Sequence, residues 1–181
     1  PNGNCHPGIN RIVSDLTYVG DSEMKSLIQW PRNRYLNVWV CDYATGAAGY
    51  ALYPASVSNF NSAMDGIVLQ HTYCGSIGTA SVYRSRTLTH EVGHWLNLRH
   101  PWGDSNEPGL AENCGDDDLV ADTPNTLGWT NCNNLYGETC GSLDNVQNFM
   151  DYSYCGRMFT LGQKTRMRNA ALSTVAQRNQ L

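Results

Sequence analysis

Three histidines and a glutamate lie close together in the segment HEVGHWLNLRH, which supplies His90, Glu91, His94 and His100. In a helix, His90 and His94 are four positions apart, so their imidazoles lie on one face about 6 Å apart along the axis and can share one metal ion. Glu91 lies roughly 100° around the helix from His90, where its carboxylate can lie behind a metal-bound water. We therefore expect Glu91 to act as a general base.

The third histidine can share this ion only if the helix ends before it. In a continuing helix, His100 would lie about 9 Å beyond His94 and roughly 240° around the axis. We expect a sharp turn at Asn97, because asparagine adopts the left-handed backbone conformation more readily than most residues. Three neutral imidazoles with an open fourth position are typical of a catalytic zinc site.

Two simpler interpretations of the motif stay open. In the first, His90 and His94 are ordinary surface residues of a helix and His100 is a loop residue. In the second, the three histidines bind zinc but catalyse nothing. Metal analysis of the purified protein tests the first interpretation directly.

Apolar residues at helical spacing predict that the motif lies in one amphipathic helix. The helix ends at about Leu96, and Ser85 or Thr87 is placed to cap its start. The repeating apolar positions are Leu88, Val92, Trp95 and Leu96.

Four further elements are predicted around this helix. Residues 21–30 form a short helix capped by Asp21, and residues 160–176 form a closing helix with a capping box of Thr160 and Gln163. Alternating apolar residues predict strands over 35–41 and 67–74. The second strand is either an edge strand that binds an extended substrate backbone or an ordinary internal strand.

Composition limits the class of protein. The chain has 181 residues, of which 41% are hydrophobic and 15% charged, and these values favour one folded domain. Its net charge is −4 and it has no long basic run, so nucleic acid is not an expected partner. No apolar run approaches the roughly 20 residues that a membrane span needs.

The seven cysteines indicate an oxidising compartment, because none of them forms a C-x-x-C pair. Four of them lie in residues 101–157, which we expect to be loop-rich and held by crosslinks. The odd number leaves one thiol that is free or pairs outside this chain. With no initiator methionine, the chain is interpreted as a trimmed piece of a secreted precursor.

The motif HExxHxxGxxH, with Asn97 at the glycine position, resembles the signature of the metzincin zinc endopeptidases. The segment NFMDY resembles their Met-turn. This resemblance implies that Met150 is the methionine beneath the histidines, and that Tyr152 matches a tyrosine that either binds the metal or supports the reaction intermediate. The segments HEVGHWLNLRHPWGD, CGDDDLVADTP and CGSLDNVQNFMDY resemble the pappalysin family, whose bacterial and archaeal members are secreted proteases.

This resemblance implies an α/β fold of the zincin type. We expect a mixed twisted sheet with a backing helix and an active-site helix, followed by a loop-rich, disulfide-stapled subdomain that ends in a helix. Residues 1–181 are then one catalytic domain, with an N-terminal subdomain over 1–100 and a C-terminal subdomain over 101–181 that carries the Met-turn.

The family's cysteine pattern implies two disulfides, Cys114–Cys140 and Cys132–Cys155. Cys5, Cys41 and Cys74 stay unassigned. Family domains begin with a strand upstream of a loop like the one at which this chain starts, so an upstream propeptide or N-terminal fragment is an expected partner. Cys5 is then available to tie such a fragment to the chain.

An acidic segment follows the motif, with aspartates at 116, 117, 118 and 122. Such hard oxygen ligands on a loop suit Ca²⁺, and the pappalysin resemblance implies structural calcium there, with Asp118 and Thr123 as ligands. The alternative is a solvated acidic turn.

The predicted function is a secreted zinc endopeptidase that acts on protein or peptide substrates. In this prediction, zinc bound by His90, His94 and His100 activates a water molecule, and Glu91 takes its proton. Tyr152 adds a hydrogen bond to the developing oxyanion. The alternatives are a zinc-dependent amidase acting on a non-protein substrate and a catalytically silent extracellular metal-binding module.

Overall fold

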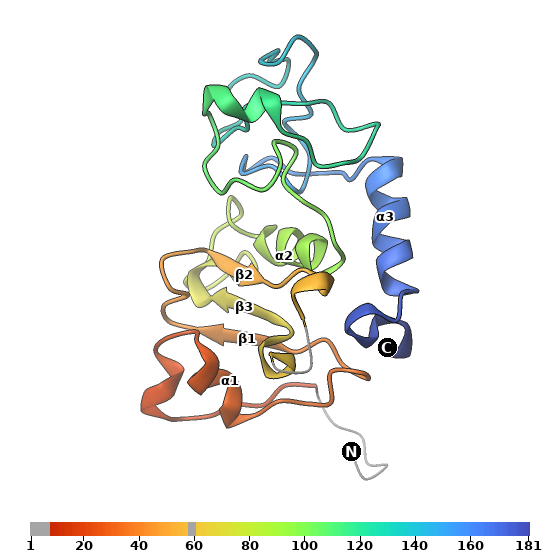
Figure 1. Cartoon of the computed structure of the whole chain (residues 1–181). Helices are drawn as coiled ribbons and strands as arrows, with labels where there is room; N and C mark the ends of the chain where they lie inside the picture. Colours follow the sequence, from red (N-terminus) through yellow and green to blue (C-terminus); the bar gives the residue numbers. More distant parts are fainter. Residues whose placement is uncertain (1–7, 58–60) are drawn as a thin grey trace.

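A computed structural model describes residues 8–57 and 61–181 of the chain. In this part, three strands form one mixed sheet in the order β1-β3-β2, with β1 parallel to β3 and β2 antiparallel to it. Helix α2 lies against β2 and β3 on the side of the loop-rich region, and α1 lies on the other side of the sheet (Figure 1). The strands are β1 (Val38–Cys41), β2 (Gly49–Ala51) and β3 (Ile67–Gln70), and the helices are α1 (Ser22–Leu27), α2 (Thr87–Trp95) and α3 (Leu161–Ala171).

The central position of β3 decides between the two interpretations of this strand. Both of its edges are paired, so residues 67–70 are an internal strand and the expectation of a substrate-binding edge there is wrong. The outer strand on the α2 side is β2. It was not predicted, because its glycine-rich sequence lacks the alternation of apolar residues by which the other strands were identified. After Gln70 the chain forms a single turn of 3-10 helix (His71–Tyr73) rather than extending the strand to residue 74.

The core of the first half forms between α1 and the sheet. As predicted, Asp21 caps α1, since its carboxylate accepts hydrogen bonds from the backbone N–H groups of Glu23 and Met24 at 3.0 and 2.9 Å. The helix ends at Leu27, three residues earlier than expected. Met24 then packs among buried side chains of the sheet and of the turn after β1. These are Trp39, Cys41, Ala44 and Val68.

Helix α3 begins as the sequence predicts and ends sooner. The capping box of Thr160 and Gln163 is present in full. The helix stops at Ala171 because Ser173 offers the backbone an alternative partner, its hydroxyl accepting from the N–H of Val175 at 3.1 Å. A separate 3-10 segment (Val175–Gln180) follows, so the prediction of one helix to residue 176 is wrong beyond residue 171.

Residues 101–157 are loop-rich, with a single short 3-10 helix at Ala111–Gly115. The structure contains both disulfides implied by the family resemblance, Cys114–Cys140 and Cys132–Cys155. Cys41 is buried and Cys74 is exposed, and both are free thiols, whereas Cys5 lies outside the described residues. The remaining short 3-10 helices are Asp15–Thr17, Pro54–Ser56 and Ser62–Met64.

The end of the chain returns to the core beside α2. Arg178 is fully buried and binds the carboxylate of Asp65 through two N–H···O contacts of 2.6 and 2.8 Å. Its guanidinium lies 3.7 Å from the ring centroid of Trp95, whose indole N–H donates to the same carboxylate. The last described residues therefore hold the end of α2 against the segment before β3. No helix within the described ranges is long and apolar enough to cross a bilayer.

Candidate active site

Helix α2 ends in a turn that brings the third histidine back to the first two. Asn97 has φ of 74°, in the left-handed region that the sequence predicts for it. The N–H of Asn97 donates to the carbonyl of His94 and the N–H of Leu98 to that of Gly93, both at 2.9 Å, which is a Schellman motif. The predicted capping by Ser85 or Thr87 is wrong, because each hydroxyl donates instead to a carbonyl of the preceding turn.

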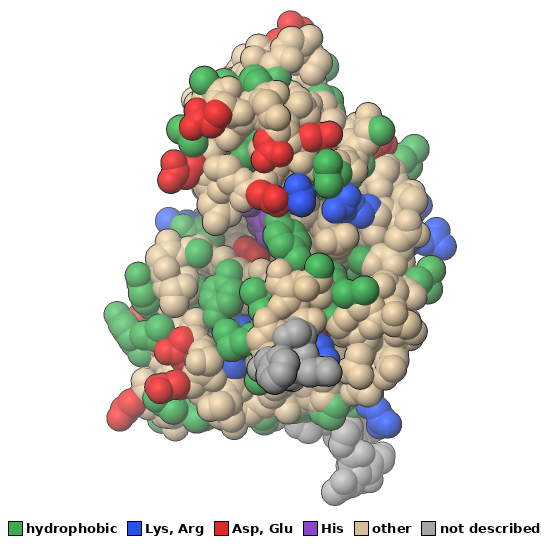
Figure 2. Space-filling model, viewed as in Figure 1, with side chains coloured by type: hydrophobic (Ala, Val, Ile, Leu, Met, Phe, Trp, Pro, Cys, Tyr) green, Lys and Arg blue, Asp and Glu red, His purple; other side chains and the backbone are tan. Residues whose placement is uncertain are grey.

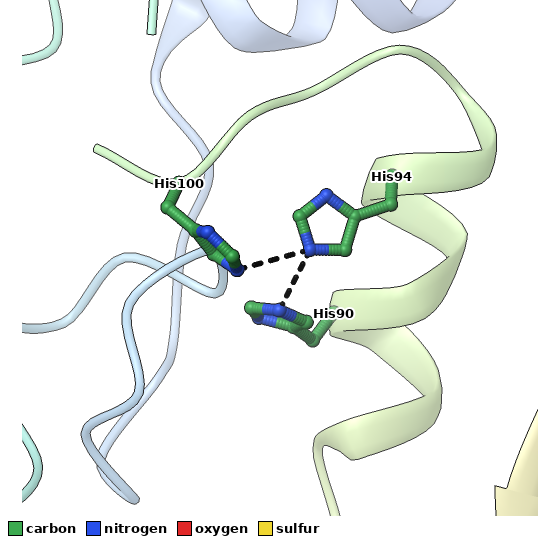
Figure 3. A group of neighbouring side chains, drawn as sticks. All are labelled: His90, His94 and His100. Atoms are coloured by element: carbon green, nitrogen blue, oxygen red, sulfur yellow. Dashed lines mark hydrogen bonds between the residues drawn. The ribbon is translucent and has the colours of Figure 1, made fainter. Parts of the chain in front are cut away.

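The three imidazoles converge through their Nε2 atoms (Figure 3). The Nε2 atom of His94 lies 3.0 Å from that of His90 and 3.2 Å from that of His100. Among the described residues, these three form the only group of three or more His, Cys, Asp or Glu side chains whose ligand atoms could hold one ion. In a continuing helix His100 could not reach the ion shared by His90 and His94, and the turn at Asn97 is what brings it close to them.

Each imidazole is oriented by a backbone carbonyl behind it. The Nδ1 atoms of His90, His94 and His100 lie 2.8, 2.8 and 2.9 Å from the carbonyl oxygens of Phe149, Leu98 and Ser105, respectively. A carbonyl only accepts hydrogen bonds, so each Nδ1 carries the proton and each Nε2 has a lone pair facing the centre.

The electrostatics of the cluster also fit a cation. Burial lowers the pKa of His94 to about 4, and burial with the neighbouring His94 lowers the pKa of His100 to about 3. Burial and the other two imidazoles lower the pKa of His90 well below its ordinary value. All three rings are therefore neutral at physiological pH, which is the form that binds zinc. The donor set fits a catalytic zinc ion, because it supplies three neutral nitrogens and no fourth His, Cys, Asp or Glu ligand among residues 8–57 and 61–181.

Glu91 is buried next to this cluster and close to β2. A Cβ atom added to Gly49 would lie 3.3 Å from Cγ of Glu91, so the glycine lets the sheet approach the helix at this point. Burial raises the pKa of Glu91 to about 8. A cation held by the three imidazoles would favour the ionised carboxylate, which is the form in which Glu91 can accept a proton.

Met150 lies in a tight turn under the histidine helix. It is fully buried, its N–H donates to Oδ1 of Asn148 at 2.9 Å, and its sulfur fills the space left by the absent side chain of Gly93. This arrangement is the one expected of the Met-turn. The requirement for a glycine at position 93 was not recognised from the sequence, although the residue stands inside the motif.

Tyr152 reaches the histidines from the segment after this turn. Its ring centroid lies 4.8 Å from that of His100 and 5.5 Å from that of His90. Burial, together with Glu91 and Tyr53, raises the pKa of the Tyr152 hydroxyl to about 12, so the group stays protonated and can donate a hydrogen bond.

The cluster opens into a cleft of about 870 Å³ between the sheet and the loop-rich half. Figure 2 shows a histidine side chain at the bottom of this recess. Strand β2 and Glu91 line one part of the cleft, and the Met-turn segment with Tyr152 lines another.

Three residues of this region were missed by sequence reasoning. Tyr53 contacts the edge of His94 at 5.5 Å between centroids, and Trp102 stacks on His100. Asp151 lines the cleft although its Oδ2 atom is buried without a hydrogen-bond partner, and burial raises its pKa to about 7. Tyr53 has no motif around it, whereas Trp102 lies within HEVGHWLNLRHPWGD and Asp151 within NFMDY, so both of these could have been considered.

The predicted calcium ligands lie near the start of α3. Asp118 is buried, its Oδ1 accepts from the N–H of Val120 at 2.9 Å, and its Oδ2 lies 3.4 Å from Nε2 of Gln163. Thr123 is buried too, with its hydroxyl 3.4 Å from that of Thr160. Burial raises the pKa of Asp118 to about 7, so a cation or a proton is needed to offset this carboxylate.

Proteins with similar sequences include extracellular metalloproteases, in agreement with the metal-binding geometry of the three histidines. An extracellular metalloprotease of Arthroderma otae is 32% identical over 157 residues, covering 83% of this chain and 56% of the relative. The chain therefore spans just over half the length of that relative.

Solved structures of mirolysin share the fold. Mature mirolysin of Tannerella forsythia in complex with a cleaved peptide has a TM-score of 0.79 and 34% identity, covering 99% of this chain and 70% of that one. A promirolysin mutant has a TM-score of 0.79 and 33% identity, covering 99% and 62%. These matches confirm the predicted zincin-type fold with its mixed sheet and active-site helix.

The family of the chain is identified by a sequence match that covers the three histidines. Residues 20–172 match the model of the peptidase M43 family, described as pregnancy-associated plasma protein-A. This match includes the three histidines, Glu91 and the Met-turn, and it confirms the pappalysin resemblance of the motifs. The chain belongs to the peptidase M43 family.

Proposed function

We propose that this chain is the catalytic domain of a zinc-dependent endopeptidase. The observation that carries the proposal is that the Nε2 atoms of three histidines converge on one point, while the Nδ1 atom of each ring is hydrogen-bonded to a backbone carbonyl. Glu91 is buried beside these histidines and lines the same open cleft. Because the cleft has walls from both halves of the chain, residues 1–181 act as one catalytic unit. Metalloprotease relatives of the same family support this activity.

His90, His94 and His100 would hold the zinc ion. When bound, zinc supplies Lewis-acid polarisation of a water molecule and of the scissile carbonyl. Glu91 accepts the proton of the attacking water and then returns it to the leaving amine nitrogen. Tyr152 donates its hydroxyl proton in a hydrogen bond toward the developing oxyanion.

The cleft suits an extended peptide. Strand β2 is an edge strand that lines the cleft, with its partner β3 on one side only. A substrate backbone can add to such an edge through main-chain hydrogen bonds. This recognition of backbone rather than of side chains favours a peptide over a non-protein amide substrate.

Digestion of denatured casein tests the activity and separates the two substrate classes. We expect the zinc-loaded protein to cut casein at internal bonds, whereas the amidase alternative predicts intact casein. Replacing Glu91 by Gln should leave bound zinc unchanged and reduce turnover by about a hundredfold to ten-thousandfold, since the general base is lost. Glu112→Gln, at an exposed glutamate, is the matched control and should keep wild-type turnover. A Glu91→Gln enzyme with normal turnover would remove Glu91 from this role.

We further propose a structural calcium site at Asp118 and Thr123. The proposal is supported by Asp118, which is buried although Asp116 and Asp122 of the same segment are exposed, and whose carboxylate accepts from Val120 and Gln163. Adding a calcium-selective chelator should lower the melting temperature, because an ion that binds only the folded state stabilises it. An unchanged melting temperature would favour the solvated acidic turn.

We also propose that the protein is secreted and that an upstream propeptide is a partner of this chain. Relatives are named extracellular metalloproteases, and the disulfides fit an oxidising compartment. The similarity to promirolysin supports an upstream propeptide as a partner of this chain.

A further inference from the structure

We propose that Trp102 is a positioning residue that sets the plane of the third zinc-binding imidazole. This inference rests on the proposed zinc site. It assigns a role to a residue outside the HExxH motif and outside the Met-turn, on the loop that follows His100.

The two rings form a parallel stack. The centroids of His100 and Trp102 lie 4.7 Å apart and their planes differ by only 8°. Trp102 is fully buried, so its ring cannot turn away into solvent. Gly128 packs closely against the indole, since a Cβ added to this glycine would lie 2.5 Å from Cε3 of the ring. The imidazole of His100 is thus held against a fixed flat surface.

The same two residues share one backbone acceptor. The carbonyl of Ser105 accepts from Nδ1 of His100 at 2.9 Å and from Nε1 of Trp102 at 2.8 Å. Because a carbonyl oxygen has two lone pairs, both hydrogen bonds can form together. Trp102 therefore fixes the acceptor that orients His100 as well as the plane of its ring.

His100 needs this support more than the other two histidines do. His90 and His94 lie on α2, whose hydrogen-bonded backbone fixes their Cα positions. His100 lies after the helix, where its backbone forms only an isolated bridge with Gly103. An irregular segment constrains a side chain less than a helix does, so a buried stacking partner substitutes for the missing backbone rigidity.

Trp102 also contacts the proposed oxyanion donor. Its ring lies edge-on to that of Tyr152, with centroids 5.2 Å apart. The rings of His100, Trp102 and Tyr152 are therefore in mutual contact, and a change at Trp102 is expected to affect both of the other two.

Zinc affinity, measured by competition with a chromogenic chelator, tests the inference without depending on turnover. Trp102→Leu should weaken zinc binding by about tenfold to a hundredfold, the usual effect of losing a group that orients a metal ligand. Trp102→Phe keeps an aromatic face against His100 and should retain most of the affinity. Trp129→Leu removes a tryptophan that donates to Asp144 instead, and should leave zinc affinity unchanged.

Two outcomes overturn different claims. If the wild-type chain binds no zinc, the proposed function fails together with this inference. If the wild type binds zinc and folded Trp102→Leu binds it equally well, only the role of Trp102 is overturned.

A fluorescence measurement covers the case in which Trp102→Leu does not fold. Zinc added to the metal-free wild type should change its tryptophan emission, because the indole stacks directly on a ligand ring. This change should disappear in Trp102→Phe and persist in Trp129→Phe. An undiminished change in Trp102→Phe would overturn the inference.

Discussion

The Nδ1 atom of every imidazole in the site bonds to a backbone carbonyl and not to a titratable side chain. The carbonyl oxygens of Phe149, Leu98 and Ser105 come from three separate segments of the chain. Since a carbonyl does not titrate, the tautomer of each histidine is independent of any second ionisable group. The geometry of the ligands therefore depends on the backbone path of these three segments.

Tyr152 is the residue whose contribution to turnover is easiest to isolate. Replacing it by Phe keeps the ring contacts to His90 and His100 and removes only the hydroxyl donor. We expect kcat to fall by about tenfold to a hundredfold with zinc affinity unchanged, by analogy with the loss of one oxyanion donor. Steady-state kinetics on a peptide substrate measures this. Tyr136→Phe, at a tyrosine that is 82% exposed, is the control, and a Tyr152→Phe enzyme with wild-type kcat would contradict the assignment.

At the scale of the element, the end of α2 is the critical feature. Asn97 adopts φ of 74°, and this conformation costs an ordinary L-residue about 1–2 kcal/mol. The turn is further held from α3, since Nε of Arg166 donates to the carbonyl of Asn97 at 2.7 Å. The position of the third ligand therefore depends on one residue in the helix terminus and one in a distant helix.

Two substitutions at position 97 separate conformation from side-chain chemistry. Asn97→Gly should keep the turn and the stability within a few tenths of a kcal/mol, whereas Asn97→Val should destabilise the protein by about 1–2 kcal/mol, because a β-branched residue is strained at positive φ. Urea unfolding of the metal-free protein measures both values. Equal stabilities for the two variants would show that the backbone conformation is not what selects asparagine here.

The helices that carry local signals could be predicted, and elements fixed by distant contacts could not. Asp21, Thr160 and Asn97 each act through neighbouring backbone groups, so their caps and turn are correct predictions. Strand β2 has a glycine-rich sequence and forms because it pairs with β3, which no local pattern reveals. The role of β3 as a central strand is likewise a property of the assembled sheet.

In the site too, residues brought together by local structure could be predicted, and residues brought together by distant contacts could not. The histidines and Glu91 were predicted from their spacing, because one helix and one turn bring them together. Tyr53 approaches the cluster from another segment and has no motif around it, whereas Trp102 lies within HEVGHWLNLRHPWGD, where its spacing does not mark it as a contact of His100. Their contacts arise from the packing of the whole chain, so spacing alone did not select them.

At the scale of the whole molecule, the end of the chain stabilises the active-site helix. Arg178, from the last 3-10 segment, forms a buried ion pair with Asp65 and stacks on Trp95 at the end of α2. In Figure 1, this segment lies beside the sheet-containing half, far along the chain from the elements it contacts. The pair thus connects residues 113 positions apart.

Removing this arginine should destabilise the whole fold. Arg178→Met leaves the carboxylate of Asp65 buried, with the indole N–H of Trp95 and the guanidinium of Arg32, at 3.7 Å, as its remaining partners, and we expect a loss of about 3–5 kcal/mol in the free energy of unfolding. Arg168→Met, at an exposed position of α3, should change it by less than about 0.5 kcal/mol. Urea denaturation compares the two variants. Similar values for both would show that the buried pair contributes little.

The covalent crosslinks are distributed unevenly over the molecule. Both disulfides lie between residues 114 and 155, while the sheet and α2 contain none. A thiol reductant would therefore loosen the cleft wall that includes Met150 and Tyr152 and spare the helix that bears His90 and His94. We therefore expect a reducing compartment to disturb the side of the proposed catalytic centre that carries Met150 and Tyr152, which would confine the proposed activity to oxidising surroundings.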